Sequence, residues 1–348
     1  MKNSFILFLF VFLFGKLYLF SQANLLNASD PSEIGVKNEI QNYNDSEEFL
    51  DYPFVDEKDI LFSKVVWEVI DLKHRINFPL LYPTDTLLVG QERRPLIHYL
   101  INGIRSRNIS KIYDDGKFNF QKSLNRFEAS LVDSIYTPDG QDKIDKYFSA
   151  ANFLKAKGEE NELLSMTDAE VEELTGDAYN NYQDKIKSLT LKYLTRGEDY
   201  RINFFSYDMV ERYMVKGVWY FDKRISELKY RPLAIAPITR NVKTMSKDAF
   251  ARSEEDISLS ELFWVYYPHA REVLKNAYVF NDRNSSVRKS FDELINARRF
   301  HSVIILEENV YADRKIEDYM KESSFNRLLE AERIKEKIRN FEHDMWSW

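Results

Sequence analysis

The chain has 348 residues, with 49 Lys and Arg against 56 Asp and Glu, a formal net charge of -7, and no cysteine. Without cysteine it has no disulfide, thiolate zinc site, cysteine nucleophile, iron–sulfur cluster or acylated cysteine anchor, because each needs a sulfur atom. The negative charge argues against free nucleic acid as a partner, since phosphate binding depends on clustered Lys and Arg.

Residues 1–23 have the pattern of a secretory signal peptide, with a basic start and an apolar run at 5–14. The pattern predicts cleavage between Ala23 and Asn24. Retention as a membrane anchor is the alternative, but Lys16 interrupts the apolar run short of the roughly 20 residues that a membrane span needs. Export of a chain without cysteine is compatible with the periplasm, where a protein with a large core can manage without disulfides.

The acidity of the chain is concentrated in residues 24–60. This segment carries ten acidic side chains and two lysines, for a net charge of -8, whereas residues 61–348 are almost neutral at -1. Such a polar stretch buries too little apolar area to offset its ordering entropy, so we expect a flexible acidic arm. It is either a solvated linker or a partner-binding arm that uses Phe49, Leu50, Tyr52 and Phe54.

Two stretches of the remaining chain resemble each other. Residues 66–83 and 218–237 share, in the same order, a Val-Trp pair, an Asp, a Pro-Leu pair and a closing Pro. Residues 95–116 and 289–309 align on a shared Leu-Ile-Asn. We interpret this as an α+β fold with an internal duplication, each half holding an apolar segment, a proline-bounded extended segment, an amphipathic helix and a short strand.

Local patterns place the elements within this scheme. Apolar residues at helical spacing predict helices in 95–107 and 314–342, and β-rich runs predict strands at 215–221 and 303–306. Residues 62–76 suit a helix as well as a strand. Between the halves, 158–177 holds eight acids and no base.

Helix starts are predicted at two capping boxes, Thr167 with Glu170 and Ser258 with Glu261. The predicted organisation is a signal peptide (1–23), an acidic flexible arm (24–60), a first α+β half (61–141), an acidic helical connection (142–200), a second α+β half (201–313) and an amphipathic C-terminal helical tail (314–348).

Recognisable catalytic motifs are absent from the sequence. It has no G-x-S-x-G elbow, no Walker loop and no G-x-G-x-x-G, and the histidines show no metal-ligand spacing. We therefore expect no enzyme activity, no catalytic residue, no cofactor and no metal. The five histidines are interpreted as core or surface residues: His74, His98, His269, His301 and His343.

Paired carboxylates are the hardest chemistry to exclude, because glycoside hydrolysis needs only two acids about 5 to 10 Å apart. The candidate pairs are Asp71 with Asp222, and Glu307 with Glu308. Basic neighbours of Asp71 and Asp222 favour structural ion pairs instead. A periplasmic carbohydrate-active enzyme is thus kept as the alternative function.

The five tryptophans divide into two groups. Trp67, Trp219 and Trp264 are expected to be structural anchors of the core. Trp346 and Trp348 end the chain and are either partner contacts or a cap on the body, since Trp is enriched in interfaces.

Several segments carry a resemblance to a known family: VIDLKHRINFPLLYP, RRPLIHYLINGIRSRNISKIYDDGKF, WYFDKRISELKYRPLAIAP and LFWVYYPHAREVLKNAYVFN. They include a Trp-x-x-Asp-Lys at 219–223 and a Phe-Trp-x-Tyr-Tyr-Pro at 263–268. In these motifs the chain resembles the gliding-motility N family, GldN/PorN, over about residues 60–313.

That resemblance implies a structural subunit of the type IX protein secretion system of Bacteroidetes, needed for protein export across the outer membrane and for gliding. It implies a periplasmic location, with a homo-oligomeric ring formed together with an outer-membrane lipoprotein, the K component. The ring would be coupled to the inner-membrane motor components L and M. The resemblance implies no catalytic residues, and it leaves open whether the chain is the main subunit or a paralogue.

Overall fold

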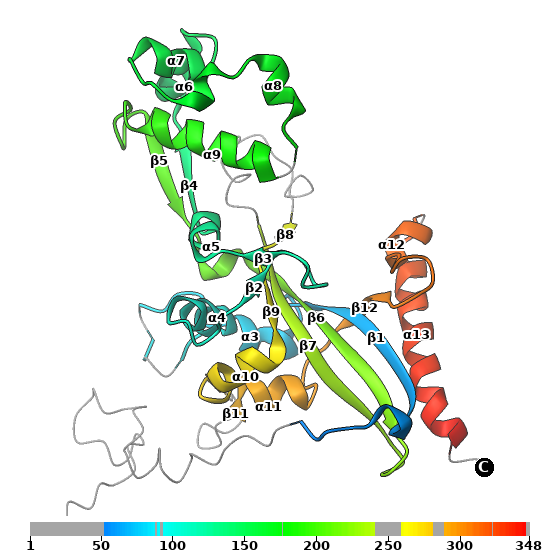
Figure 1. Ribbon diagram of the computed structural model, residues 1–348. Helices are drawn as coiled ribbons and strands as arrows, with labels where there is room; N and C mark the ends of the chain where they lie inside the picture. The colour runs from blue at the N-terminus through cyan, green and yellow to red at the C-terminus, as the bar shows by residue number, and fades with distance from the viewer. Residues whose placement is uncertain are drawn as a thin grey trace, which may run out of the picture. The chain divides into compact units, whose positions relative to one another are not determined.

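The computed structural model describes residues 52–87, 89–90, 93–175, 177–240, 259–280, 289–321 and 323–345 (Figure 1). Both helices and strands are present, which confirms the α+β class. The chain divides into two compact units. Unit 1 contains Met1–Lys111, Arg212–Ile235 and Val265–Trp348, and unit 2 contains Ile112–Glu211 and Ala236–Trp264.

Unit 1 is built on long antiparallel strands that lie side by side in Figure 1. The strand order is β12-β1-β6-β7-β9, and β1 pairs in antiparallel fashion with both β6 and β12. The strands are β1 (Ile60–Asp71), β6 (Val210–Asp222), β7 (Glu227–Arg240), β9 (Trp264–Tyr266) and β12 (Val303–Glu307). The predicted strands at 215–221 and 303–306 therefore lie within β6 and β12.

The ambiguous segment 62–76 begins as a strand. Three consecutive residues of β1, Val66, Trp67 and Glu68, are buried, so both faces of the strand are covered at its centre. A strand covered on both faces loses the alternation of apolar and polar residues that distinguishes it from a helix. That is why the sequence pattern suited either element.

The helices of unit 1 pack mainly against one another and against the strands. Helix α10 contacts both α4 and α11, and the buried faces of these helices include Leu100, Leu274 and Phe291. The helical elements are η2 (Glu57–Asp59), η3 (Arg75–Asn77), α3 (Phe78–Leu81), α4 (Leu96–Arg105), α10 (Tyr267–Lys275), α11 (Phe291–Asn296), α12 (Ile316–Tyr319) and α13 (Ser324–Met345). A two-stranded pair, β10 (Tyr278–Val279) with β11 (Lys289–Ser290), precedes α11.

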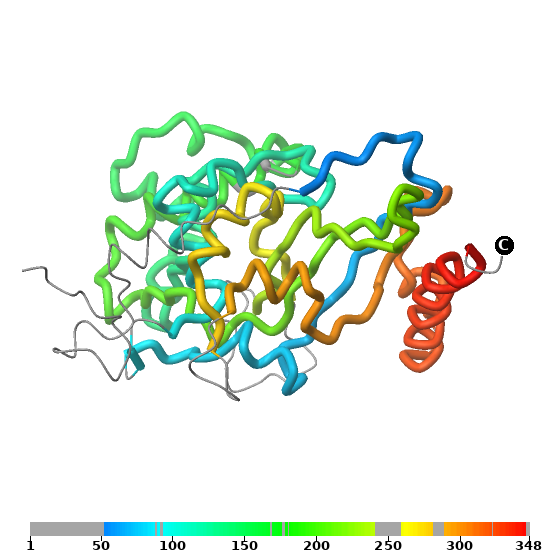
Figure 2. Tube along the Cα trace, turned by 90° about the horizontal axis from the view of Figure 1, so that it is seen from below, coloured from blue at the N-terminus to red at the C-terminus, as the bar shows by residue number. Residues whose placement is uncertain are grey.

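Helix α13 lies along the β12 side of the sheet, as the tube view shows (Figure 2). Its residues Ala331, Ile334 and Ile338 are buried with Val66 of β1 and Ile304 of β12. The spacing of three and four residues places the helix side chains on one face. The packing attaches the C-terminal segment to the sheet edge.

Unit 2 contains the acidic middle of the chain. Its helices enclose a core that includes Ile144, Phe153, Leu154, Ile186 and Leu189. The helical elements are α5 (Leu124–Ser130), α6 (Pro138–Asp145), α7 (Ala150–Ala156), η4 (Glu162–Ser165), α8 (Asp168–Glu173), α9 (Asp177–Leu191) and η5 (Tyr207–Met209). The strand pairs are β2 (Ile112–Tyr113) with β3 (Gln121–Lys122), β4 (Val132–Tyr136) with β5 (Tyr200–Phe204), and β8 (Leu259–Glu261) with the end of β7.

The capping predictions had mixed outcomes. Thr167 and Glu170 form the predicted box at the start of α8. The prediction at 258–261 was wrong as a helix start, because Glu261 belongs to strand β8; Ser258 lies outside the described residues. A box that was not predicted, Ser290 with Glu293, begins α11.

The two similar stretches form different elements after their first strand. Strand β1 is followed by η3 and α3, with Pro79 at the start of α3, whereas the counterpart Pro232 lies inside β7. Proline suits the first turn of a helix because no backbone N–H is needed there. The extended segment expected after β1 is thus a short helix, and the duplication and the six predicted segment boundaries stay predictions.

Gly217 provides a test of how β6 and β7 pack. A Cβ at this position would collide with the hydroxyl and Cζ of Tyr230, so the ring of Tyr230 covers the glycine. We predict that Gly217→Ala lowers the free energy of unfolding by about 1–3 kcal/mol, measured by urea denaturation, because the ring must move. In a Tyr230→Ala background the same change should cost much less; an equal cost in both backgrounds would show that this contact is not the reason.

Candidate functional site

The candidate carboxylate pair Asp71 and Asp222 does not form in the structure. Strands β1 and β6 pair along their whole length, with Asp71 opposite Arg212 at one end and Asp222 opposite Ile60 at the other. At about 3.3 Å per residue, the two acids are roughly 35 Å apart. A glycosidase pair must lie within about 10 Å. This pair is therefore excluded as a catalytic dyad.

Asp222 is held in an ion pair at the turn between β6 and β7. It is 2% exposed. Arg224 donates from Nε to Oδ1 at 3.0 Å and from Nη2 to Oδ2 at 2.8 Å, and its backbone N–H also donates to Oδ1. These hydrogen bonds hold the pKa of Asp222 below its usual range. The carboxylate fixes the turn.

The second candidate pair shows no catalytic geometry either. The Glu307 carboxylate lies 3.2 Å from Lys64 Nζ, which also donates to the backbone carbonyl of Glu308 at 2.7 Å. The backbone N–H of Glu308 donates to Val65 O. Both glutamates thus lie where β12 ends against β1, with Glu307 paired to a cation.

Two of the five histidines come together. The rings of His74 and His301 lie 4.6 Å apart between centroids. The buried Asn77 holds the two segments, because its amide nitrogen donates to the carbonyls of Asp71 and His301 and its oxygen accepts from the His301 N–H. Within the described ranges no group of three or more His, Cys, Asp or Glu is placed to hold a metal ion.

The tryptophans expected as anchors lie in different surroundings. Trp67 is 8% exposed and Trp264 is 1% exposed. Trp219 is half-buried, with the Tyr230 ring 5.1 Å away and the guanidinium of Arg298 4.8 Å from its ring centroid. Besides Ser258, several residues named from the sequence lie outside the described residues: Lys16, Ala23, Asn24, Phe49, Leu50, Trp346 and Trp348.

A buried ion pair that sequence reasoning missed lies beside Trp219. Glu68 of β1 is 1% exposed, and both its oxygens accept from Arg298 Nη2, at 3.1 and 2.8 Å. Ser302 Oγ donates to the same carboxylate at 2.6 Å, and the Tyr230 ring lies 4.1 Å from the Arg298 guanidinium. The sequence signal that could have indicated this pair is Glu68 itself, an acidic residue within a mostly apolar stretch. The pair joins β1 to the connection between α11 and β12.

The loop that follows β12 exposes two apolar side chains. Val310 is 91% exposed and Tyr311 is 75% exposed. The side chain of Asn309 holds the loop: its oxygen accepts from the N–H of Tyr311 at 2.9 Å and of Arg314 at 3.4 Å, and its nitrogen donates to the carbonyl of Glu307 at 2.9 Å. The two exposed side chains therefore stand on a fixed backbone.

The first turns of α13 are also apolar and exposed. Phe325, Leu328 and Leu329 are 64%, 45% and 52% exposed. Further along the same helix Ile334 and Ile338 are buried, whereas these three residues are exposed. Together with Val310 and Tyr311, these three residues are called the C-terminal apolar set. Apolar side chains that are exposed in one contiguous patch mark protein contact sites, whereas single ones are common on any protein surface.

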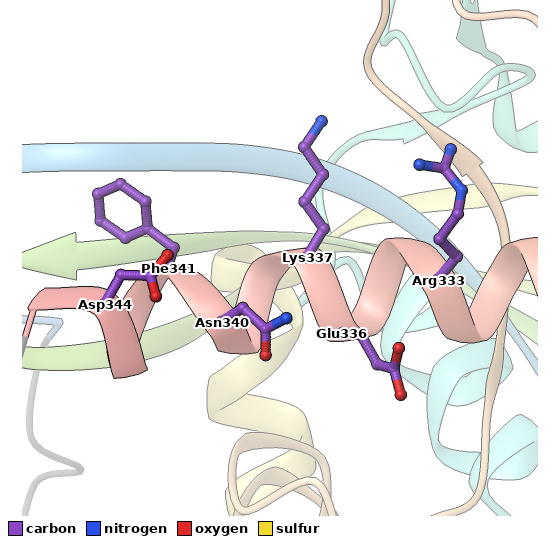
Figure 3. Close-up of a pocket in the computed structure, with 6 residues that line it drawn as sticks. All are labelled: Arg333, Glu336, Lys337, Asn340, Phe341 and Asp344. Atoms are coloured by element: carbon purple, nitrogen blue, oxygen red, sulfur yellow. The ribbon is translucent and has the colours of Figure 1, made fainter.

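The far end of α13 carries a shallow hollow of about 400 Å³ (Figure 3). Arg333 and Lys337 extend from the same side of the helix as Phe341, which stacks on Phe62 at 4.5 Å. The lining residues are Arg333, Glu336, Lys337, Asn340, Phe341 and Asp344. The hollow mixes positive and negative side chains, which suits a polar contact with another molecule.

Taken together, these features define an α+β protein whose candidate site is a contact surface on its C-terminal segment. No helix in the described part of the chain has the length and apolar character to cross a membrane. The chain belongs to the GldN family: the model of the gliding motility associated protein GldN matches residues 55–347. The family resemblance is thereby confirmed, and it extends into the C-terminal tail. None of the curated proteins compared with the chain matches it.

Removal of the Arg298 side chain should destabilise the protein, because it leaves the Glu68 carboxylate buried with only Ser302. We predict that Arg298→Ala lowers the free energy of unfolding by about 3 kcal/mol, the lower end for a broken buried pair, since Arg298 is 20% exposed. Arg299→Ala is the matched control, because Arg299 is exposed and adjacent. Equal losses in the two variants, measured by urea denaturation, would refute a structural role for the pair.

The depressed pKa of Asp222 predicts how stability depends on pH. Its unfolded pKa is about 3.9, so its contribution to the free energy of unfolding is present above about pH 4 and is lost as pH falls through the folded-state pKa. We expect Asp222→Asn to be less stable than wild type at pH 7 and to lose less stability between about pH 5 and pH 2. Urea denaturation across this range is the measurement. Asp208→Asn, a change at an exposed acid, is the control and should leave the pH profile of stability unchanged. If Asp222→Asn showed the same pH dependence as wild type, the prediction would be contradicted.

Proposed function

We propose that the protein is a structural subunit of the type IX protein secretion system, needed for protein export across the outer membrane and for gliding motility. The observation that carries this proposal is the GldN family match over residues 55–347. The proposed location is the periplasm, reached through the signal peptide predicted at residues 1–23.

The proposed partners are an outer-membrane lipoprotein, the K component, and the inner-membrane motor components L and M. The subunit would form a homo-oligomeric ring with the lipoprotein. Because the sequence has no cysteine to acylate, attachment to the outer membrane would come from that partner. The near-neutral charge of residues 61–348 supports close packing against other proteins, since little like-charge repulsion opposes it.

We also propose that the subunit has no enzymatic activity of its own. The competing hypothesis, a carbohydrate-active enzyme, depended first on Asp71 and Asp222, and their positions at opposite ends of the β1–β6 pair rule out that dyad. The exposed C-terminal apolar set supports a contact role instead. Its residues stand on a fixed loop and on the start of a packed helix.

The proposal predicts that the C-terminal apolar set is needed for assembly. We expect a strain lacking the gene to lose cargo secretion and gliding. Complementation with the Tyr311→Ser, Leu329→Ser double variant should leave a folded protein but reduce its co-sedimentation with the lipoprotein at least tenfold, because interface energy concentrates in a few apolar and aromatic residues. Phe148→Ser is the matched control, since Phe148 is 95% exposed in unit 2.

Two results would count against this function. Wild-type protein that sediments as a monomer from native membranes, with no lipoprotein partner, would end the proposal of a ring subunit. Full co-sedimentation of the double variant would leave the assembly proposal standing but remove the C-terminal apolar set from the interface.

A further inference from the structure

Tyr52, the first described residue, is clamped on unit 1. Two guanidinium groups contact its ring, with Arg271 Cζ 4.2 Å and Arg231 Cζ 4.8 Å from the ring centroid. Its hydroxyl donates to Asn296 Oδ1 at 2.6 Å. Stacked cations and a directed acceptor recognise a phenol ring specifically. We call Arg231, Arg271 and Asn296 the tyrosine slot.

The next two residues are held through their backbone. Arg231 Nη2 donates to the carbonyl of Pro53 at 2.9 Å, and Arg224 Nη2 donates to the carbonyl of Phe54 at 3.3 Å. The Phe54 side chain is 82% exposed. The protein therefore binds residues 52–54 through one side chain and two carbonyls, which is how an extended peptide is recognised.

Two walls of the tyrosine slot are fixed by groups other than Tyr52. Arg271 pairs with the buried carboxylate of Asp292, which also accepts from the Tyr267 hydroxyl at 2.8 Å. Asn296 donates its amide nitrogen to Asp292 Oδ1 at 2.8 Å and to Asp292 O at 2.9 Å, which turns its oxygen toward Tyr52. Because Asp292 holds Arg271 and Asn296 in place whether or not Tyr52 is bound, binding a ligand here costs little side-chain entropy.

The resident segment also leaves part of the tyrosine slot unused. Among the described residues, the Arg231 Nε–H is buried and has no hydrogen-bond partner. Burial raises the pKa of the Tyr52 hydroxyl, which keeps it protonated as a donor. The residues before Tyr52 include Asp45, Glu47, Glu48 and Asp51. Arg271 and Arg224 are already paired with Asp292 and Asp222, so the ring and backbone contacts, rather than charge, hold the segment.

We propose that the tyrosine slot is a binding site for extended peptides that carry a Tyr-Pro pair, and that residues 52–54 are its resident, exchangeable ligand. A peptide of the same chemistry occupies the slot in trans when Tyr52 leaves it. The inference rests on unit 1 contacts alone and does not depend on the secretion role.

Binding of a labelled peptide of residues 45–56 to the full chain tests this proposal by fluorescence anisotropy. Tyr52→Ala should bind the peptide saturably, whereas wild type should show no saturable binding at micromolar peptide. The reason is that the tethered segment competes at an effective concentration in the millimolar range. A peptide with Phe for Tyr should bind Tyr52→Ala about fivefold more weakly, the equivalent of one hydrogen bond. A peptide with Ala for Tyr should not bind.

Two further variants serve as controls for the binding experiment. Phe54→Ala, changed at an exposed neighbour, should behave as wild type. Tyr52→Phe keeps the ring and loses only the hydroxyl contact, so its affinity for the peptide should fall between those of wild type and Tyr52→Ala, and it replaces Tyr52→Ala if that variant does not fold. The proposal is overturned if no folded Tyr52 variant binds, if wild type binds as tightly, or if the Ala peptide binds equally well.

Discussion

The buried carboxylate of Glu68 is the constraint on which much of unit 1 depends. A charge at the centre of a strand, 1% exposed, is tolerated only with a paired cation and satisfied hydrogen bonds. Arg298 supplies that cation from a position 230 residues further along the chain, and it does so with a left-handed backbone, φ 50°. Such a conformation is unfavourable for a residue with a Cβ, so the surrounding contacts must stabilise it. The ion pair thereby specifies where the chain turns into β12.

The position of β12 in turn determines that of the C-terminal segment. Once β12 pairs with β1, Ile304 and Val66 offer an apolar surface that α13 covers with Ile334 and Ile338. The same arrangement leaves the start of α13, including Leu328, without cover from unit 1. The pairing of β12 with β1 therefore determines both which part of α13 is buried against the sheet edge and which part stays exposed. The loop built on Asn309 connects the two.

Elements with strong local patterns could be predicted from the sequence, and long-range contacts could not. The helix in 95–107 and the strands near 215–221 and 303–306 follow from apolar spacing and β-branched content. The Glu68–Arg298 pair and the clamp on Tyr52 join residues more than 170 positions apart, and the tertiary packing of helices, strands and connections brings them together. The spacing of apolar residues predicted a C-terminal helix, but it does not show where the covering sheet ends and so could not separate the buried residues of α13 from the exposed ones.

The buried acids of the described residues have a structural role. In the part of the chain that the structure describes, each of the five buried carboxylates is paired with a cation: Glu68 with Arg298, Asp133 with Lys187, Asp199 with Lys143, Asp222 with Arg224 and Asp292 with Arg271. A general base or nucleophile needs a free lone pair, a general acid needs a proton to donate, and each needs access to substrate. These acids instead use their oxygens to tie turns, helices and strands together. Each of these pairs joins segments that are separate in the sequence or fixes a turn, so buried charge in the described residues stabilises the fold.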